Sequence, residues 1–265
     1  MPQRFYVYTI WGDNKFPKIR SLCIINGVML EKRNFAEGEF YHIYNRGNNK
    51  QNIFFNKEDY DRFTKLLYLC NSNKKINFRE DIVDKEIDAY DFEREEPILS
   101  IGAWVLMPNH FHLYITIPPR SDLGKNQRSD LGEFGGISVF AKKLCIGYSM
   151  YVNKKYSRSG GLFEGRFKSV HIENDRQAKY LFSYIHLNPV KIIDHAWKAQ
   201  GVANKNETLK FLDEYKWSSY NDYKNKKRKE SVIISPTDFP DYFSSPKVFK
   251  REIFDWLSFH NDPKI

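Results

Sequence analysis

Two apolar runs that are separated by only two residues constrain the fold of this chain more than any other feature. They are "ILSIGAWVLM" (98–107) and "HFHLYITI" (110–117), and Pro108 and Asn109 lie between them. Both runs have the aromatic and β-branched content of strands, and a Pro-Asn pair favours a tight turn. So short a connection joins antiparallel neighbours. The sequence therefore predicts a β-hairpin in the centre of the chain.

The segments on either side of this hairpin alternate between strand and helix patterns. "FYHIYN" (40–45) and "KSVHIE" (168–173) have the composition of strands. Three segments have apolar residues at helical spacing, and we predict that they follow the N-caps Asn56, Ser138 and Asn174. The apolar positions of the first two helices are Tyr60, Phe63, Leu67, Cys70, Phe140, Leu144, Tyr148 and Tyr151.

From residue 39 onward, the expected order is strand, helix, strand, strand, helix, strand, helix. This is the order of a ferredoxin-like, split βαβ fold in the α+β class, with a four-stranded antiparallel sheet. We expect the helices to cover one face of the sheet and to leave the other face open. Extra C-terminal helices follow, and the last of them has its apolar residues on one side, at Phe249, Ile253, Trp256 and Leu257.

Three regions follow from this pattern. We expect an N-terminal extension at 1–36, one domain at 37–223, and a basic linker with a C-terminal helix at 224–265. Inside the domain, the charged segment that includes an acidic insert at 77–96 has the composition of a surface loop. The short repeat "RSDLG" at 120–135 also has the composition of a loop, because it is polar and too short for a structural repeat.

Charge and cysteine content narrow the class of protein. The formal net charge of the 265 residues is +9, which suits a partner with many negative charges but does not identify nucleic acid. The basic run "KNKKRK" (224–229) is expected to be solvated, with phosphate contact as the alternative. Cys23, Cys70 and Cys145 lie too far apart for a zinc motif or a disulfide framework, which indicates a reducing cytoplasm. We found no signal peptide and no apolar run long enough for a membrane span.

The strand "HFHLYITI" places two histidines on one face. Alternate strand residues share a face, so His110, His112 and Tyr114 point one way and the apolar residues between them point the other. The Cβ atoms of residues i and i+2 lie about 6–7 Å apart, close enough for both imidazoles to bind one divalent ion. In the alternative interpretation, the histidines only make local hydrogen bonds at a strand end.

The helix that follows Asn174 contains a second set of polar groups. Tyr180, Tyr184 and Asn188 are spaced by four residues, so they form one line along the helix. An asparagine oxygen is a suitable ligand for magnesium or manganese, and a tyrosine hydroxyl is a nucleophile. Aromatic residues that pack on the sheet would give the same pattern. His186 points away from Tyr184, so we interpret it as a surface residue or as part of the local structure.

Five segments in a fixed order make the pattern specific. "YHIYNRGNNKQNIFF", "VLMPNHFH", "GLFEGRFKS", "YIHLNPVK" and "WSSY" resemble the REP-associated tyrosine transposases, a branch of the single-tyrosine HUH transposases. The resemblance extends from about residue 37 to residue 223. It implies a nuclease domain in which His110 and His112 form the HUH pair and Tyr184 is the nucleophile. It also implies that Asn188 is the third ligand of Mg²⁺ or Mn²⁺, in place of a glutamine in related transposases.

The resemblance further implies a reaction and a substrate. The reaction is cleavage and rejoining of single-stranded DNA through a 5′-phosphotyrosine, as in transposition, and the DNA is a hairpin formed by a palindromic repeat. Tyr44, Phe163 and Phe167 are candidates for base stacking. The candidates for other DNA contacts are Asn45, Arg46, Asn48, Lys50, Arg166 and Lys168.

Two other functions remain open at this stage, as does the choice between monomer and homodimer. A four-stranded sheet with exposed aromatic residues also describes non-catalytic RNA-recognition modules. Such a module, however, has no reason to hold two histidines, a tyrosine and an asparagine in register. The other alternative is a descendant of a transposase that binds DNA and has lost mobility.

Overall fold

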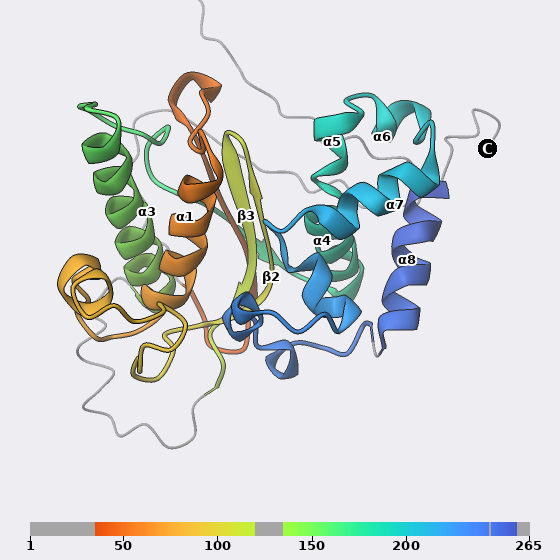
Figure 1. Ribbon diagram of the computed structural model, residues 1–265. Coiled ribbons are helices and arrows are strands. Elements are labelled where there is room, and N and C mark those ends of the chain that lie inside the picture. The colour runs from red at the N-terminus through yellow and green to blue at the C-terminus, as the bar shows by residue number, and fades with distance from the viewer. Residues whose placement is uncertain (1–34, 120–134, 244, 259–265) are drawn as a thin grey trace, which may run out of the picture.

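The computed structural model describes residues 35–119, 135–243 and 245–258, and a four-stranded antiparallel sheet lies at its centre (Figure 1). The strands are β1 (Phe40–Arg46), β2 (Ser100–Met107), β3 (His110–Thr116) and β4 (Lys168–Ile172). Their order is β2-β3-β1-β4, which is the ferredoxin-like order, so the predicted fold class is confirmed. Two predicted regions lie almost wholly outside the described residues. Only the last two residues of the N-terminal extension and the last residue of the "RSDLG" repeat are described.

One face of the sheet is covered by α1 (Lys57–Leu69) and α3 (Gly135–Lys155), the two helices of the split βαβ unit (Figure 1). Asn56 caps α1 as predicted, and it forms a capping box with Asp59. α3 begins before Ser138, so the predicted cap at that residue is wrong. The reason is a close contact at Gly136, where a Cβ atom would lie 2.7 Å from Cγ2 of Ile98. Glycine therefore allows an extra helical turn to pack against the start of the hairpin.

The second face is not open, and this part of the prediction is wrong. α4 (Asp175–Leu187) and α8 (Pro246–Ser258) contribute to a second core on that side, with short helices around them (Figure 1). All eight residues of β2 are buried, because both alternating sets of its side chains are apolar or small. A strand of this kind needs cover on both faces. The remaining helices are α5 (Val190–Ile193), α6 (Trp197–Gln200) and α7 (Lys205–Glu214).

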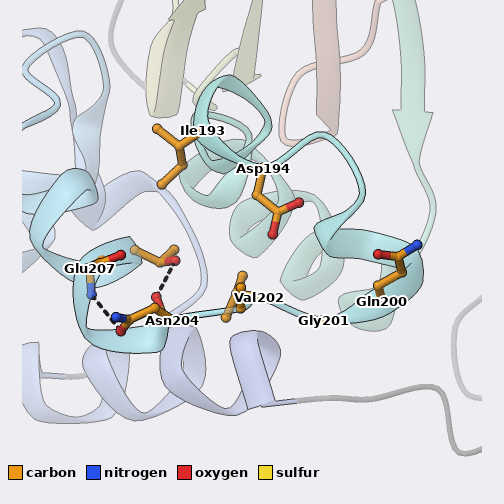
Figure 2. A pocket seen from close by; sticks show the side chains of 9 residues that line it. Ile193, Asp194, Gln200, Gly201, Val202, Asn204 and Glu207 are labelled. Carbon is orange, nitrogen blue, oxygen red and sulfur yellow. Dashed lines mark hydrogen bonds between the residues drawn. The ribbon is translucent and has the colours of Figure 1, made fainter.

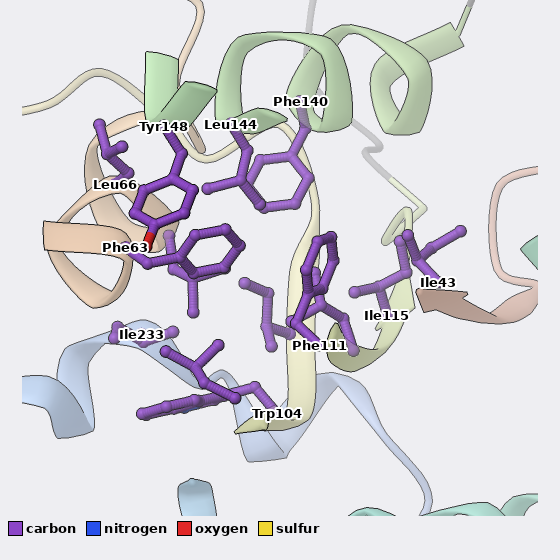
Figure 3. Close-up of a cluster of buried hydrophobic side chains, with 14 of the residues drawn as sticks. Ile43, Phe63, Leu66, Trp104, Phe111, Ile115, Phe140, Leu144, Tyr148 and Ile233 are labelled. Carbon is purple, nitrogen blue, oxygen red and sulfur yellow. The ribbon is translucent and has the colours of Figure 1, made fainter. Parts of the chain in front are cut away.

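Aromatic side chains fill the core between the sheet and the first pair of helices (Figure 3). Phe63 of α1 lies between Phe111 of β3 and Tyr148 of α3, with ring centroids 5.0 and 4.9 Å away. The hydroxyl of the buried Tyr148 donates to the Ile53 carbonyl at 2.6 Å, so its burial leaves no polar group unsatisfied. This core fixes the position of β3, the strand of the two histidines.

The basic run 224–229 is not a simple solvated linker. Lys224 pairs with Asp213, and Lys229 pairs with Asp88. Arg228 is largely buried and pairs with Asp222 at 2.6 Å. These three cations are therefore used within the chain, because the segment folds back over the end of α7 and over the charged insert. The predicted C-terminal helix is confirmed as α8, with Phe249, Ile253 and Leu257 buried.

The charged insert 77–96 is mostly turns, as expected, but it has a small core of its own. It contains one π-helical turn, Arg79–Val83. Ile82, Ala89 and Phe92 are buried against Leu69 at the end of α1. The helices in the described part of the chain lack the length and apolar composition that a membrane-spanning helix needs.

Candidate metal and tyrosine site

The pairing of β1 with β3 determines which side chains surround the two histidines. Tyr44 lies opposite His112, and Arg46 lies opposite His110, so these four side chains share the face that α4 covers. The rings of His110 and His112 are 4.9 Å apart. The alternation of residues along the strand predicted that the two histidines share one face, and in the structure they lie side by side on that face.

A third histidine, which the sequence analysis missed, contacts this pair. Nε2 of His42 lies 2.8 Å from Nδ1 of His112, and the two rings are stacked with centroids 5.0 Å apart. Burial lowers the pKa of His42 to about 3, so its imidazole is neutral at physiological pH and can accept a hydrogen bond. The only sequence signal was its position on strand "FYHIYN", two residues before Tyr44. The contact itself depends on the register between two strands that are 70 residues apart.

α4 brings Tyr184 and Asn188 to the histidines. The helix begins after its N-cap Asn174, as predicted, and Asn188 is its C-cap residue before Pro189. The ring centroids of Tyr184 and His112 are 5.3 Å apart, in an edge-to-face arrangement. Asn188 is fully buried. The four residues of the predicted catalytic and metal set are therefore contributed by two adjoining elements, β3 and α4.

The histidines of the site are kept neutral. Burial lowers the pKa of His110 to about 4, the positive charge of Lys191 acts in the same direction, and the nearby Asn188 amide opposes it. Burial also lowers the pKa of His112 well below its ordinary value, and the neighbouring imidazoles and lysines lower it further. A metal ligand must be a neutral imidazole, so both rings have a suitable protonation state.

The predicted metal set contains buried polar atoms of the type that bind a divalent ion. In the described part of the chain, Nε2 of His112 and both amide atoms of Asn188 are buried and form no hydrogen bond of good geometry, although the Asn188 side chain lies close enough to His110 to raise the pKa of that imidazole. Each such atom costs about 1–3 kcal/mol of stability if nothing binds it. The described residues contain no group of three or more His, Cys, Asp or Glu that could hold a metal. The candidate set has only two imidazoles, and its third member is an amide. The amide oxygen of Asn188 is of the type that binds Mg²⁺ or Mn²⁺, whereas imidazole also suits zinc and other transition-metal ions, so the choice of Mg²⁺ or Mn²⁺ stays a prediction.

The two tyrosines of α4 have different neighbours. Tyr180 stacks on Tyr184 at 6.1 Å and contacts Trp256 of α8 at 5.5 Å. Burial raises the pKa of Tyr180 to about 12, and the adjacent Tyr184 adds to the shift. Tyr184 instead contacts His112. Of these two tyrosines, Tyr184 is the one that contacts a predicted metal ligand, and its role as the nucleophile stays a prediction.

His186 is fully buried, so its interpretation as a surface residue is wrong. Its Nδ1 donates to the Phe182 carbonyl at 2.9 Å, and its Nε2 accepts from the Ser219 hydroxyl at 2.8 Å. The alternative that it belongs to the local structure describes it better. Burial lowers its pKa to about 3. It points away from Tyr184, as expected, and it links α4 to the segment "WSSY".

The candidate DNA-contact residues lie on two loops that are joined beside His110, or on the strand ends next to these loops. Gly47 N donates to Asn109 O at 2.8 Å, Asn48 N donates to Leu162 O at 2.9 Å, and Glu164 N donates to Arg46 O at 2.8 Å. The chain turns so tightly at Gly47 that a Cβ atom would lie 2.1 Å from Gln51 O. Glycine is therefore required at this position. The joined loops carry the exposed side chains of Asn48, Lys50, Arg166 and, at the start of β4, Lys168.

Two of these candidates have partners within the protein. Asn45 is buried on the opposite face of β1, where its amide donates to Gly165 O at 3.2 Å. Arg46 pairs with Glu164, with a shortest N–O distance of 2.6 Å. These contacts hold the second loop in place. A direct role of Asn45 or Arg46 in DNA contact stays a prediction.

A separate pocket lies between α5, α6 and α7 (Figure 2). Its side chains include Asp194 and Glu207, and none of the predicted site residues lines it. Two carboxylates do not suit a phosphate. The pocket is therefore a poor candidate for the nucleic-acid site. The lining residues are Ile193, Asp194, Gln200, Gly201, Val202, Ala203, Asn204, Glu207 and Thr208.

Comparison with known proteins finds a distant likeness in structure. The sequence matches no protein-family model, and it is not detectably similar to any curated protein. The described structure is similar to a solved structure of a REP-associated tyrosine transposase bound to a REP hairpin. The two are 15% identical, with a TM-score of 0.42, and the match covers 80% of this chain and 92% of the other. A likeness at this level carries no argument about function, so the function must be inferred from the residues of this chain.

Proposed function

We propose that this chain is an HUH-type tyrosine transposase that cleaves and rejoins single-stranded hairpin DNA with the help of Mg²⁺ or Mn²⁺. One observation supports this most strongly. The Tyr184 ring contacts His112, and the unpartnered, buried Nε2 of His112 and Oδ1 of Asn188 lie in the same site. A nucleophile beside metal-binding atoms is the arrangement that phosphodiester cleavage needs. The five ordered motifs of the sequence agree with this reaction.

In the proposed reaction, the Tyr184 hydroxyl oxygen attacks the phosphorus of the scissile phosphodiester. A phosphorus–oxygen bond to tyrosine forms, and the bond from phosphorus to the 3′ oxygen breaks. The phenol proton is passed to the departing 3′ oxygen through solvent, so a free 3′ hydroxyl and a 5′-phosphotyrosine result. A divalent ion held by His110, His112 and Asn188 would neutralise charge on the phosphate. Attack by a new 3′ hydroxyl reverses the step and rejoins the DNA without ATP.

The covered sheet face argues against the rival RNA-recognition function. Such modules stack bases on aromatic residues of an open sheet. Here α4 packs on the corresponding face, and Tyr114 in the middle of β3 is buried. Single-stranded DNA would instead reach Tyr184 at the edge of this cover, beside the exposed basic residues of the two joined loops.

A covalent-adduct assay tests the proposal. The wild-type chain is incubated with labelled DNA hairpins that have single-stranded flanks, in the presence of Mg²⁺ or Mn²⁺. A denaturing gel then reveals protein-linked DNA. We expect an adduct with the wild-type chain and with Tyr180→Phe, and none with Tyr184→Phe, because that variant lacks only the attacking oxygen.

Two further observations would contradict the assignment. Peptide mapping of the adduct should locate the DNA on Tyr184, and attachment to Tyr180 would make our choice of nucleophile wrong. His110→Ala and His112→Ala should abolish cleavage while they largely keep hairpin binding. Cleavage at the normal rate by the double alanine variant would exclude the metal role of the two histidines.

A further inference from the structure

Two lysines lie over the proposed nucleophile. α5 follows α4 directly after Pro189, and α6 comes soon after it, so both short helices lie at one end of α4 (Figure 1). Nζ of Lys198 in α6 is 4.2 Å from the centroid of the Tyr184 ring. Nζ of Lys191 in α5 is 5.4 Å from the same centroid. Two lysine amines from different helices thus converge on one phenol, and burial together with the charge of Lys191 lowers the pKa of Lys198 to about 7.

Among the described residues, these two lysines have no carboxylate as a partner. In the part of the chain that the structure describes, neither ammonium group forms an ion pair with a carboxylate. The acidic residue between them in sequence, Asp194, instead accepts a hydrogen bond from Ala196 N at 3.0 Å. Lys224 and Lys229, by contrast, are paired with aspartates. Lys191 and Lys198 differ from these two lysines in having no aspartate partner among the described residues.

Packing against an aromatic ring does not account for this arrangement. A lysine over a ring at a partly exposed site contributes about 0.5–1 kcal/mol. A second ammonium beside the first adds like-charge repulsion, which cancels part of that gain. The positive charges of both lysines also help to lower the pKa of His112, so they contribute a positive potential at the site. An anion that binds between the two lysines would offset the repulsion between their positive charges.

We propose that Lys191 and Lys198 form a phosphate clamp, which holds the non-bridging oxygens of the scissile phosphodiester against the Tyr184 hydroxyl. This inference rests on the proposed function and adds to it the residues that position the substrate. Ammonium groups bind phosphate as point charges, so the clamp suits a backbone phosphate of any sequence. The same two charges stabilise the negative charge that develops on the phosphate and on the phenol oxygen during cleavage and rejoining.

Kinetic measurements give the first test. We compare Lys191→Ala/Lys198→Ala with a matched control, Lys142→Ala/Lys154→Ala, which removes two exposed lysines of α3 across the sheet. With a hairpin that the wild-type chain cleaves, the clamp variant should form adduct about 100-fold more slowly, while its affinity for the hairpin falls about 5-fold or less. The control should keep the wild-type rate, and Lys191→Arg/Lys198→Arg should recover part of it.

A second measurement is independent of cleavage. Lysine acetylation of the wild-type chain is followed by mass spectrometry, without metal, with and without oligothymidine. Lys191 and Lys198 should be protected by the oligonucleotide, whereas Lys142 and Lys154 should be labelled equally in both samples. Protection in this experiment, together with no adduct in the cleavage assay that contains Mg²⁺ or Mn²⁺, would support the phosphate clamp and reject the proposed reaction. Equal labelling of the clamp lysines with and without DNA, or a wild-type cleavage rate in the clamp alanine variant, would overturn the clamp.

Discussion

At the scale of single residues, the hydrogen bond between His42 and His112 determines which nitrogen can bind an ion. For Nε2 of His112 to be a ligand, the ring proton must be on Nδ1, and Nδ1 then donates to Nε2 of His42 at 2.8 Å. The lowered pKa of His42 keeps that acceptor neutral. In the proposed metal site, His42 would be a positioning residue that holds the His112 ring in one orientation and one tautomer.

Replacement of His42 by alanine should therefore weaken metal binding. Loss of an outer partner of a metal ligand commonly lowers affinity about 10–100-fold, and we expect a loss in this range for His42→Ala. Calorimetric titration with Mn²⁺ measures it directly. His171→Ala is the control, because His171 is half exposed on the other side of the sheet and pairs with Glu39. An unchanged Mn²⁺ affinity in His42→Ala would show that the ring has no positioning role.

The sequence was sufficient for some site residues and not for others. His110 and His112 could be predicted from the alternation of residues along one strand. Tyr184 and Asn188 could be predicted from their spacing of four residues along one helix. His42, Lys191 and Lys198 could not. Their contacts depend on the register of two distant strands and on how two short helices pack, and neither follows from local periodicity.

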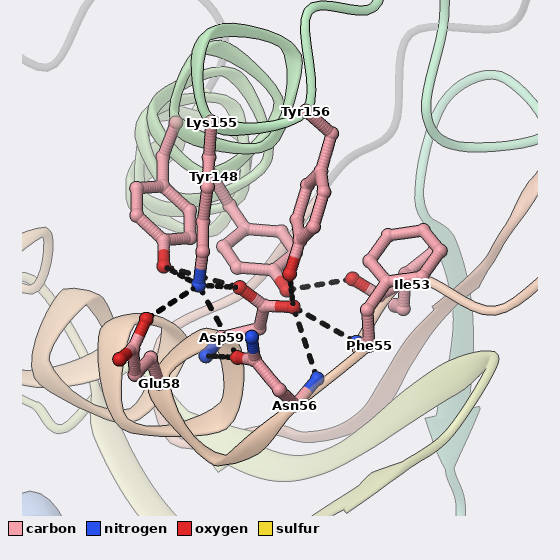
Figure 4. A network of polar contacts seen from close by, with 9 residues as sticks. Ile53, Phe55, Asn56, Glu58, Asp59, Tyr148, Lys155 and Tyr156 are labelled. Carbon is pink, nitrogen blue, oxygen red and sulfur yellow. Dashed lines mark hydrogen bonds and ion pairs between the residues drawn. The ribbon is translucent and has the colours of Figure 1, made fainter.

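At the scale of elements, one buried carboxylate joins α1 to α3 (Figure 4). Asp59 is fully buried. It accepts hydrogen bonds from Phe55 N, from the Tyr156 hydroxyl at 2.7 Å and from Lys155 at 2.8 Å. Burial acts to raise the pKa of Asp59, but these hydrogen bonds outweigh it and lower the pKa overall. The carboxylate therefore stays charged and paired in the folded chain.

Replacement of Asp59 by alanine should destabilise the fold by about 3 kcal/mol, because it leaves buried donors unpaired and removes the capping box of α1. Chemical denaturation measures this change in the free energy of unfolding. The neighbouring Glu58 offers a matched control, since it also pairs with Lys155 but is 77% exposed. Glu58→Ala should change stability by about 0.5 kcal/mol or less. Similar losses in the two variants would contradict the role of the buried carboxylate.

The buried His186 gives a pH dependence to the contact between α4 and the "WSSY" segment. Its pKa is about 3 in the folded chain and close to 6.5 when exposed, so the unfolded chain binds the extra proton first. Stability is therefore lost as the pH falls from about 6.5 towards 3. At pH 5 this residue alone accounts for about 2 kcal/mol. Urea unfolding at pH 7 and at pH 5 measures how much stability each chain loses between the two pH values. The loss in His186→Gln should be smaller than the loss in the wild-type chain by about 2 kcal/mol. Equal losses in the two chains would show that His186 does not cause the pH dependence.

At the scale of the whole molecule, the order of elements was enough to predict the sheet and the strand order that follows from it. It was not enough to predict how the second face is covered. Short apolar segments after Pro189 gave little periodicity, yet they pack with α8 into a second core. The apolar residues on both sides of β2 were the available signal, because they require burial on both faces.

The net charge of +9 leads to a last prediction, which concerns how salt affects DNA binding. Several of the cations are used in ion pairs within the chain, as at Lys224, Arg228 and Lys229, so net charge alone overestimates the number of phosphate contacts. Each true contact with single-stranded DNA lowers log K by about 0.7 for each tenfold increase in salt. Arg166→Ala/Lys168→Ala should therefore reduce the slope by about 1.4, whereas Lys142→Ala/Lys154→Ala, with the same loss of charge, should leave it unchanged. Fluorescence anisotropy of labelled hairpin DNA over a series of salt concentrations measures both slopes. If the two double variants change the slope equally, the effect comes from overall charge and the joined loops do not bind the backbone.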